Sequence, residues 1–294
     1  MSDVLLRTTA TLPSADKFDD NNTLFRPTEP IKLAPFVRNV SELTPLSTAA
    51  LGKNNIRYEI PKTEGDIAAC VWLKGEMNAL AAPTGGASYV RWCDYLGYSL
   101  IKECRLKYGS SVLQTWRKED FFVFHNTYYD DSAQLREDVN AVGNVVPAKR
   151  IWQARRPLKF KARLHNIFFG DDYSKAFQVQ GASQKLTLEF DLEQDRALIQ
   201  TDGVTNNIFL ADPSQYFSSL QLQVEMYHVL RRERDLGVQM YSNPRGMRLL
   251  FDDTQWHTGS RLNSTELLDG TEVSLELKNL YAHIRLIVIH SPSM

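Results

Sequence analysis

The sequence has almost no excess charge of either sign. It holds 34 Lys and Arg against 35 Asp and Glu, so the formal net charge is -1. A nearly neutral protein has no overall field that draws it to nucleic acid or to a membrane surface. Sequence-specific nucleic-acid binding is therefore not expected, and any anionic partner has to be met by a local group of cations.

Cysteine is scarce, and long apolar runs are missing. The three cysteines, Cys70, Cys93 and Cys104, have no metal-ligand spacing and cannot all pair, which favours a reducing compartment such as the cytosol. No segment approaches the roughly 18 apolar residues needed to cross a bilayer, and the N-terminal residues have no secretory signal. The composition is that of an ordinary soluble protein with one large domain or two small ones.

The motifs that carry most enzyme chemistry are also missing. There is no G-x-x-x-x-G-K-[ST] phosphate loop, no G-x-G-x-x-G, no H-E-x-x-H and no G-x-S-x-G. The histidines are scattered without a metal-ligand spacing. The acidic pairs Asp171-Asp172 and Asp252-Asp253 adjoin turn residues, where aspartate is favoured for its own backbone hydrogen bonds. We therefore expect no enzyme activity, no metal and no cofactor.

What the sequence does contain is a two-residue alternation of apolar and polar side chains. It is clearest in "KLTLEFDL", where Leu186, Leu188 and Phe190 share one face while Glu189 and Asp191 share the other. The same alternation appears in residues 56–60, 67–73, 100–108, 158–164 and 220–226. Each of these segments is predicted to be a β-strand with one buried face.

Turns and helices complete the pattern. Gly109-Ser110-Ser111 predicts a turn between the strand that begins at Leu100 and a returning strand over Val112–Trp116. Lys102 is the one polar residue on the apolar side of the first of these strands. Helix is expected only over Lys118–Thr127 and Ser132–Val142. Many short strands with little helix predict an all-β fold, a jelly-roll β-sandwich.

Three polar segments lie outside this pattern. Residues 1–30 are predicted to be a flexible arm that becomes ordered only in an assembly. "RRERD", Arg231 to Asp235, is predicted to be a self-paired, solvated turn. The third segment, residues 148–163, has seven cations and no acidic residue, and it either grips an anionic or acidic partner or forms in part a solvated strand face. Its cations are Lys149, Arg150, Arg155, Arg156, Lys159, Lys161 and Arg163.

Four phrases in order carry a family resemblance. "WCDYLGYSLIKECRLKYGSSVLQTW", "PLKFKARLHNIFFGDDYSKAFQVQGASQKLTLEFDL", "LQLQVEMYHVLRRERD" and "LELKNLYAHIRLIVIH" resemble successive segments of the major capsid proteins of nucleocytoplasmic large DNA viruses. The resemblance extends over about residues 55–290. It implies a double jelly roll that trimerises into a pseudo-hexagonal capsomer of an icosahedral shell. It also implies a place in the virion, with assembly in the host cytoplasm.

The resemblance divides the chain into an arm over residues 1–30, a first jelly roll over 31–235 and the start of a second over 236–294. This second roll is either unusually compact, completed by another chain, or cut short because the chain is a fragment. The expected partners are further copies of the chain, neighbouring capsomers, minor capsid proteins, a completing second chain and, indirectly, the inner virion membrane. The alternatives are a carbohydrate- or protein-binding jelly-roll module and a membrane-lining viral scaffold protein.

Overall fold

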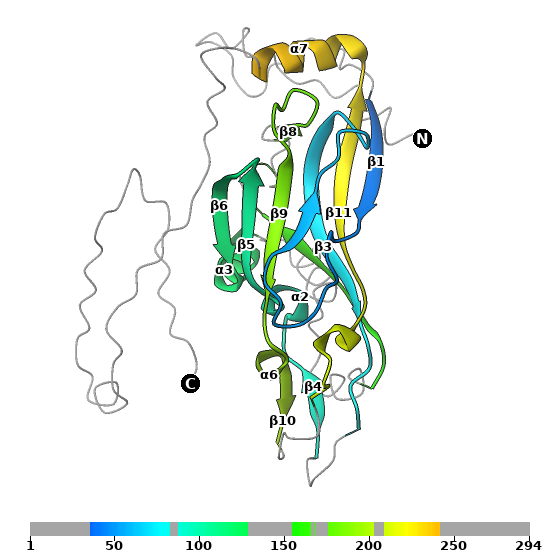
Figure 1. Ribbon diagram of the computed structural model, residues 1–294, viewed down its shortest axis with the longest axis vertical. Coiled ribbons are helices and arrows are strands. Elements are labelled where there is room, and N and C mark those ends of the chain that lie inside the picture. The colour runs from blue at the N-terminus through cyan, green and yellow to red at the C-terminus, as the bar shows by residue number, and fades with distance from the viewer. Residues whose placement is uncertain are drawn as a thin grey trace, which may run out of the picture.

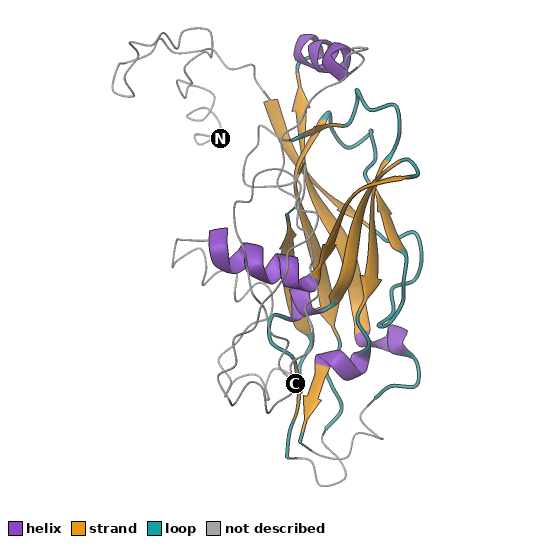
Figure 2. Ribbon diagram, turned by 90° about the vertical axis from the view of Figure 1, so that its left-hand side faces the viewer, coloured by secondary structure: helices purple, strands orange, loops and turns teal. Residues whose placement is uncertain are grey.

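The computed structural model describes residues 36–82, 88–128, 155–165, 168, 176–202 and 209–241. Within these ranges, two antiparallel β-sheets pack face to face, and helices lie at the ends and on one side of the sandwich (Figures 1 and 2). The predicted all-β jelly-roll sandwich is confirmed. None of the described helices is long and apolar enough to span a membrane.

The first sheet has four main strands in the order β1-β11-β3-β7. They are β1 (Phe36–Leu43), β11 (Phe217–Val229), β3 (Ile67–Met77) and β7 (Leu158–Leu164). The short strand β8 (Phe177–Gln178) pairs with the start of β3. The strand β11, which is the last of them in the chain, therefore lies between β1 and β3.

The second sheet has the order β2-β9-β5-β6. Its strands are β2 (Ile56–Glu59), β9 (Leu186–Leu192), β5 (Ile101–Tyr108) and β6 (Ser111–Arg117). Of the eight main strands taken in chain order, the first, third, sixth and eighth form one sheet and the other four form the second sheet. This distribution defines a complete jelly roll.

The apolar faces predicted from the alternation form the core between the sheets. Tyr58 of β2 and Phe190 of β9 are both fully buried, and their rings meet edge to face with centroids 5.7 Å apart. Across the sandwich, the first sheet contributes buried side chains from β3, β7 and β11, and burying each one stabilises the fold by about 1.5–3 kcal/mol. They include Val71, Leu73, Phe160, Leu164, Leu222 and Val224.

The hairpin of β5 and β6 is confirmed, and the structure explains why Lys102 interrupts its apolar face. Gly109 provides the positive φ of the turn, at 61°. The pairing of β5 with β9 shifts register between Ile101 and Glu103. This bulge changes the phase of the alternation, so Lys102 is exposed although Ile101 and Cys104 are both buried.

Two groups of elements lie at opposite ends of the sandwich (Figure 1). At the lower end, β4 (Val90–Trp92) pairs with β10 (Ile199–Thr201) in a two-stranded ribbon close to α6 (Asp195–Leu198). At the upper end lies α7 (Arg231–Tyr241). The remaining helical elements are α2 (Leu96–Ser99), α3 (Lys118–Tyr128) and the 3-10 helix η4 (Pro213–Tyr216).

The helix α7 corrects the prediction of a turn over Arg231–Asp235. The predicted self-pairing is present, because Arg231 Nε lies 3.8 Å from Asp235 Oδ2, but these residues form the first turns of a helix. Arg234 Nε pairs with the buried carboxylate of Asp66 at 2.8 Å. Gly237 lies so close to Gln178 that a Cβ there would be 2.4 Å from Nε2. Contacts with the sandwich, which local sequence does not reveal, thus stabilise a helix here.

Other predictions fall partly outside the described residues. The helix over Lys118–Thr127 is confirmed as α3, whereas that over Ser132–Val142, the arm over residues 1–30 and residues 242–294 lie outside the described ranges. The helix α7 runs across the expected domain boundary between residues 235 and 236. The division into an arm and two rolls remains a prediction.

Candidate functional site

The basic stretch divides into three parts in the structure. Lys149 and Arg150 lie outside the described residues. Arg155 and Arg156 are exposed just before β7 begins. The other three cations, Lys159, Lys161 and Arg163, lie on β7 itself, on the face opposite to the buried Phe160 and Ala162.

The cations of β7 contact its neighbour, β3. Lys159 Nζ lies 3.8 Å from Glu76 Oε2. Lys161 Nζ lies 4.4 Å from the centroid of the Trp72 ring, and Arg163 donates to Cys70 Sγ at 3.6 Å. Such pairs across a sheet each stabilise it by about 0.2–1 kcal/mol. Lys161 and Arg163 are therefore engaged within the roll, whereas Arg155, Arg156 and Lys159 are the exposed members of the described part of the stretch.

A second charged surface, not predicted as a site, covers the outer face of the second sheet. Its centre is Glu189 on β9, whose side chain is only 2% exposed although it lies on the polar side of the strand. Arg57 Nε and Lys107 Nζ lie 3.0 and 2.8 Å from Glu189 Oε2. Arg105 Nη2 lies 3.0 Å from Glu189 Oε1. Three cations from two neighbouring strands thus surround one carboxylate.

Two further carboxylates extend this set, which we term the Glu189 network. Arg105 Nη1 pairs with Glu103 at 2.7 Å, and its Nη2 pairs with Asp191 at 2.8 Å. Burial by itself would raise the pKa of Glu189, but hydrogen bonds from Lys107 and Arg57 and the charges of Lys107 and Arg105 outweigh it and hold that pKa below its ordinary value. The network is balanced in charge, and its carboxylates are held in ion pairs.

The described histidines and cysteines form no recognisable catalytic arrangement. No group of three or more His, Cys, Asp or Glu residues in the described ranges is placed to hold a metal ion. All three thiols are buried. Burial raises the pKa of Cys93 to about 11 and raises that of Cys104 still further, so both thiols are protonated and poor nucleophiles at neutral pH.

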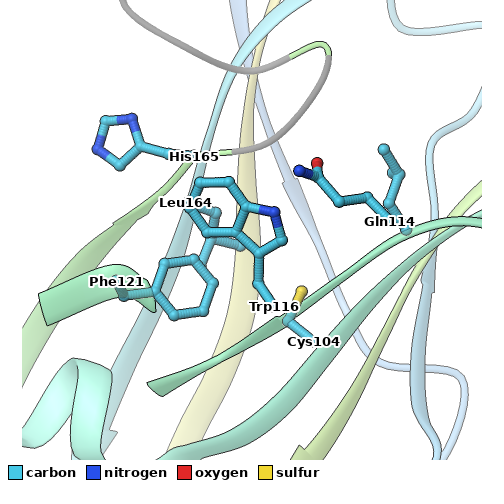
Figure 3. A pocket seen from close by; sticks show the side chains of 7 residues that line it. Cys104, Gln114, Trp116, Phe121, Leu164 and His165 are labelled. Carbon is cyan, nitrogen blue, oxygen red and sulfur yellow. The ribbon is translucent and has the colours of Figure 1, made fainter. Parts of the chain in front are cut away.

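A small cavity lies between the sheets where His165 follows β7 (Figure 3). It measures about 10 Å³ and is lined by side chains of the hairpin, α3 and the end of β7. That volume is enough for at most one water molecule. The lining residues are Cys104, Leu106, Gln114, Trp116, Phe121, Leu164 and His165. This cavity is a packing defect of the core and too small for a substrate.

A larger cleft, which sequence analysis missed, opens beside the ribbon of β4 and β10. It has a volume of about 520 Å³. Two arginines contribute to its wall, and each lies against an aromatic ring: Arg91 Cζ is 5.4 Å from the Tyr89 centroid, and Arg196 Cζ is 5.8 Å from the Phe209 centroid. Gln200 and Thr201 of β10 also line it. We term this site the Arg91 cleft.

The strand order and the two sheets define the class of the fold, a jelly roll. Among solved structures, the chain is similar to VP54 of PBCV-1, in a crystal structure fitted into a reconstruction of the virophage Sputnik, with a TM-score of 0.55 and 16% identity. It is equally similar to the quasi-atomic model of the PBCV-1 virus capsid, with a TM-score of 0.54 and 17% identity. The Faustovirus major capsid protein matches with a TM-score of 0.54 and 12% identity.

These likenesses confirm, at the level of fold, the resemblance to the double jelly-roll capsid proteins of large DNA viruses. The match covers 74% of this chain and 48% of each PBCV-1 chain, and 81% of this chain and 62% of the Faustovirus protein. The chain thus spans about half the length of the PBCV-1 structures it matches. No protein-family model matches the chain, and no curated protein is significantly similar to it.

Proposed function

We propose that this protein is a structural capsid protein whose jelly roll is a rigid building block of an icosahedral viral shell. The observation that carries the proposal is the strand order of the two sheets, β1-β11-β3-β7 and β2-β9-β5-β6, together with the structural likeness to major capsid proteins. In the proposed assembly, three copies form a pseudo-hexagonal capsomer. The protein is then located in the virion after assembly in the host cytoplasm.

The outer faces of the sandwich support a structural role. On the second sheet, the Glu189 network fixes long charged side chains in one arrangement. On the first sheet, Lys161 and Arg163 of β7 contact Trp72 and Cys70. Side chains already fixed lose little conformational entropy when a neighbouring subunit covers them. Preorganised faces of this kind suit a subunit that binds its neighbours through many weak lateral contacts. In a closed shell, these contacts act together and strengthen the overall association.

The proposed partners are further copies of the chain, neighbouring capsomers and minor capsid proteins, with indirect contact to an inner virion membrane. We also propose that a second polypeptide, or the remainder of a longer product, completes the second roll, because the chain spans 48% of the PBCV-1 proteins that it matches. Arg155 and Arg156 are the proposed contact with an acidic patch on a neighbour.

The oligomeric state tests this proposal directly. Light scattering after size exclusion is expected to give three times the 33.6 kDa mass of the chain, or three times the mass of its complex with a completing chain. Negative-stain electron microscopy of the same peak is expected to show pseudo-hexagonal particles. A monodisperse monomer at micromolar concentration with the completing chain present would contradict the proposal.

A further inference from the structure

The two arginines of the Arg91 cleft differ from the cations of the Glu189 network. Arg57, Arg105 and Lys107 all have carboxylate partners. Neither the Arg91 nor the Arg196 guanidinium forms an ion pair with any described residue, and each is instead held near an aromatic ring. In a protein with a net charge of -1, two unpaired guanidinium groups in one cleft mark a local anion-binding surface.

Hydrogen-bonding capacity is left over in the same cleft. Arg91 and Gln200 face each other as partners in the pairing of β4 with β10. Arg91 Nε and Gln200 Oε1 are both buried, and neither has a hydrogen-bond partner within the described residues. An unsatisfied buried donor or acceptor costs about 1–3 kcal/mol. Both residues line the cleft, so a ligand that carries both an acceptor and a donor would relieve both costs once these two side chains turn toward it.

The nearby carboxylate of Asp202 already accepts hydrogen bonds from the residues that precede β4. Its Oδ1 accepts hydrogen bonds from the backbone N–H of Ser88 at 2.8 Å and of Tyr89 at 3.2 Å, and its other oxygen accepts from the Ser88 hydroxyl. Asp202 therefore fixes the backbone at Tyr89, whose ring in turn lies against Arg91. The guanidinium is thus positioned before any ligand arrives, which lowers the entropic cost of binding.

The geometry points to a binding site for an acidic saccharide in the Arg91 cleft. Its carboxylate would take charge-assisted hydrogen bonds from Arg91 and Arg196. Its hydroxyl or amide N–H groups would donate to Gln200 Oε1, and its ring would occupy the rest of the cleft between the Tyr89 and Phe209 side chains. The site lies at the end of the sandwich opposite to α7 (Figure 1).

The size and composition of the cleft favour this class of ligand. About 520 Å³ falls in the range of sites for small organic molecules and exceeds what one inorganic ion fills. A single-stranded nucleic acid would need a basic groove that continues along its backbone, together with open aromatic faces for its bases. Here the cations near the described cleft are two arginines, and each already lies against one of the two rings.

The experiment compares 3'-sialyllactose with lactose, its uncharged counterpart, on the full chain by saturation-transfer NMR and calorimetry. We expect a Kd of about 1 mM for sialyllactose and no saturable binding of lactose. Arg91→Gln and Arg196→Gln are each expected to weaken binding by about tenfold or more. Arg232→Gln, which removes an exposed arginine at the other end of the molecule, is the matched control and is expected to leave binding unchanged.

Three results would overturn the assignment. They are equal binding of lactose and sialyllactose, no binding of sialyllactose at about 10 mM, and tighter binding of uridine monophosphate than of sialyllactose. The comparison of ligands on the unaltered protein does not depend on the folding of any variant. Because binding and oligomeric state are measured separately, failure of this site leaves the capsid proposal standing.

Discussion

Phe160 on β7 places its ring where a side chain on residue 75 of β3 would have to be. The two residues are cross-strand partners, and a Cβ at Gly75 would lie 2.5 Å from Cζ of the ring. The glycine therefore makes room for a buried aromatic side chain from the neighbouring strand of the first sheet. This close approach requires Gly at residue 75 for as long as residue 160 is aromatic.

Gly75→Ala is expected to lower the free energy of unfolding by about 1–3 kcal/mol, because the added methyl group overpacks the core against Phe160. Chemical denaturation measures the loss. In the double variant with Phe160→Leu, the loss in unfolding free energy should be smaller than the sum of the losses in the two single variants, since the smaller side chain leaves room for the methyl group. Strict additivity would show that the ring and residue 75 do not compete for the same space.

Removing the central charge of the Glu189 network should destabilise the fold. Glu189→Gln keeps the shape but leaves Arg57, Arg105 and Lys107 without their shared carboxylate, and the expected loss is about 3 kcal/mol. Thr187→Ala, on the same face of β9, is a control without a charge and should change stability much less. Equal unfolding free energies for Glu189→Gln and the parent would contradict this account.

The same network has a predicted pH dependence. The pKa of Glu189 is lowered in the folded protein, so the network's contribution is fully present above the ordinary carboxyl pKa and is lost as the pH falls through the lowered value. Thermal midpoints recorded from neutral to acidic pH should therefore fall more steeply for the parent than for Glu189→Gln. Parallel curves would show that protonation of Glu189 does not contribute to acid unfolding.

The pair of Asp66 and Arg234 is expected to hold α7 on the sandwich. Asp66 Oδ1 pairs with Arg234, and Oδ2 accepts from the backbone N–H of Val229 at 2.9 Å. Asp66→Ala should therefore increase amide hydrogen exchange throughout α7 while β5 and β9 stay protected. Arg231→Ala, which removes only the exposed pair with Asp235, is the matched control and should have little effect. Unchanged exchange in α7 would show that other contacts hold the helix.

The exposed arginines before β7 are expected to act in assembly only. Arg155→Glu combined with Arg156→Glu should leave the thermal midpoint almost unchanged, since exposed charges contribute little to stability. The assembled fraction should fall, by an amount that depends on ionic strength. Lys102→Glu, also exposed on the sandwich, is the control. Assembly equal to that of the parent at every salt concentration would make the two arginines a solvated surface.

Much of the sandwich could be predicted because alternation is a local property. The strand β7 matches its predicted range to the residue, and β9 begins one residue after the start of the predicted segment, since each is long enough to show a period of two and has one buried face. The strands β4 and β10 are three residues long, too short for any period, so the ribbon was missed. The Arg91 cleft was missed with it, because Arg91 and Arg196 are brought together only by the pairing of these strands.

The charged segments could be predicted less well than the strands. The alternation correctly placed Glu189 on the polar face, but its burial depends on cations of β2 and β5, which are distant in sequence. Similarly, the basic stretch gave no sign that three of its members would contact β3. Local sequence shows which side chains are charged, whereas the register between strands decides which of them are paired.

The position of β11 has a consequence for synthesis of the protein. This strand is the last of the roll to leave the ribosome, yet it lies between β1 and β3 and pairs with both along most of its length. Until Val229 has emerged, the nascent chain cannot join these two strands, and their edges stay open to pairing with other chains. Contacts so distant in sequence also form slowly. In a crowded cell, the yield of folded protein should therefore depend on chaperones that shield these edges during translation.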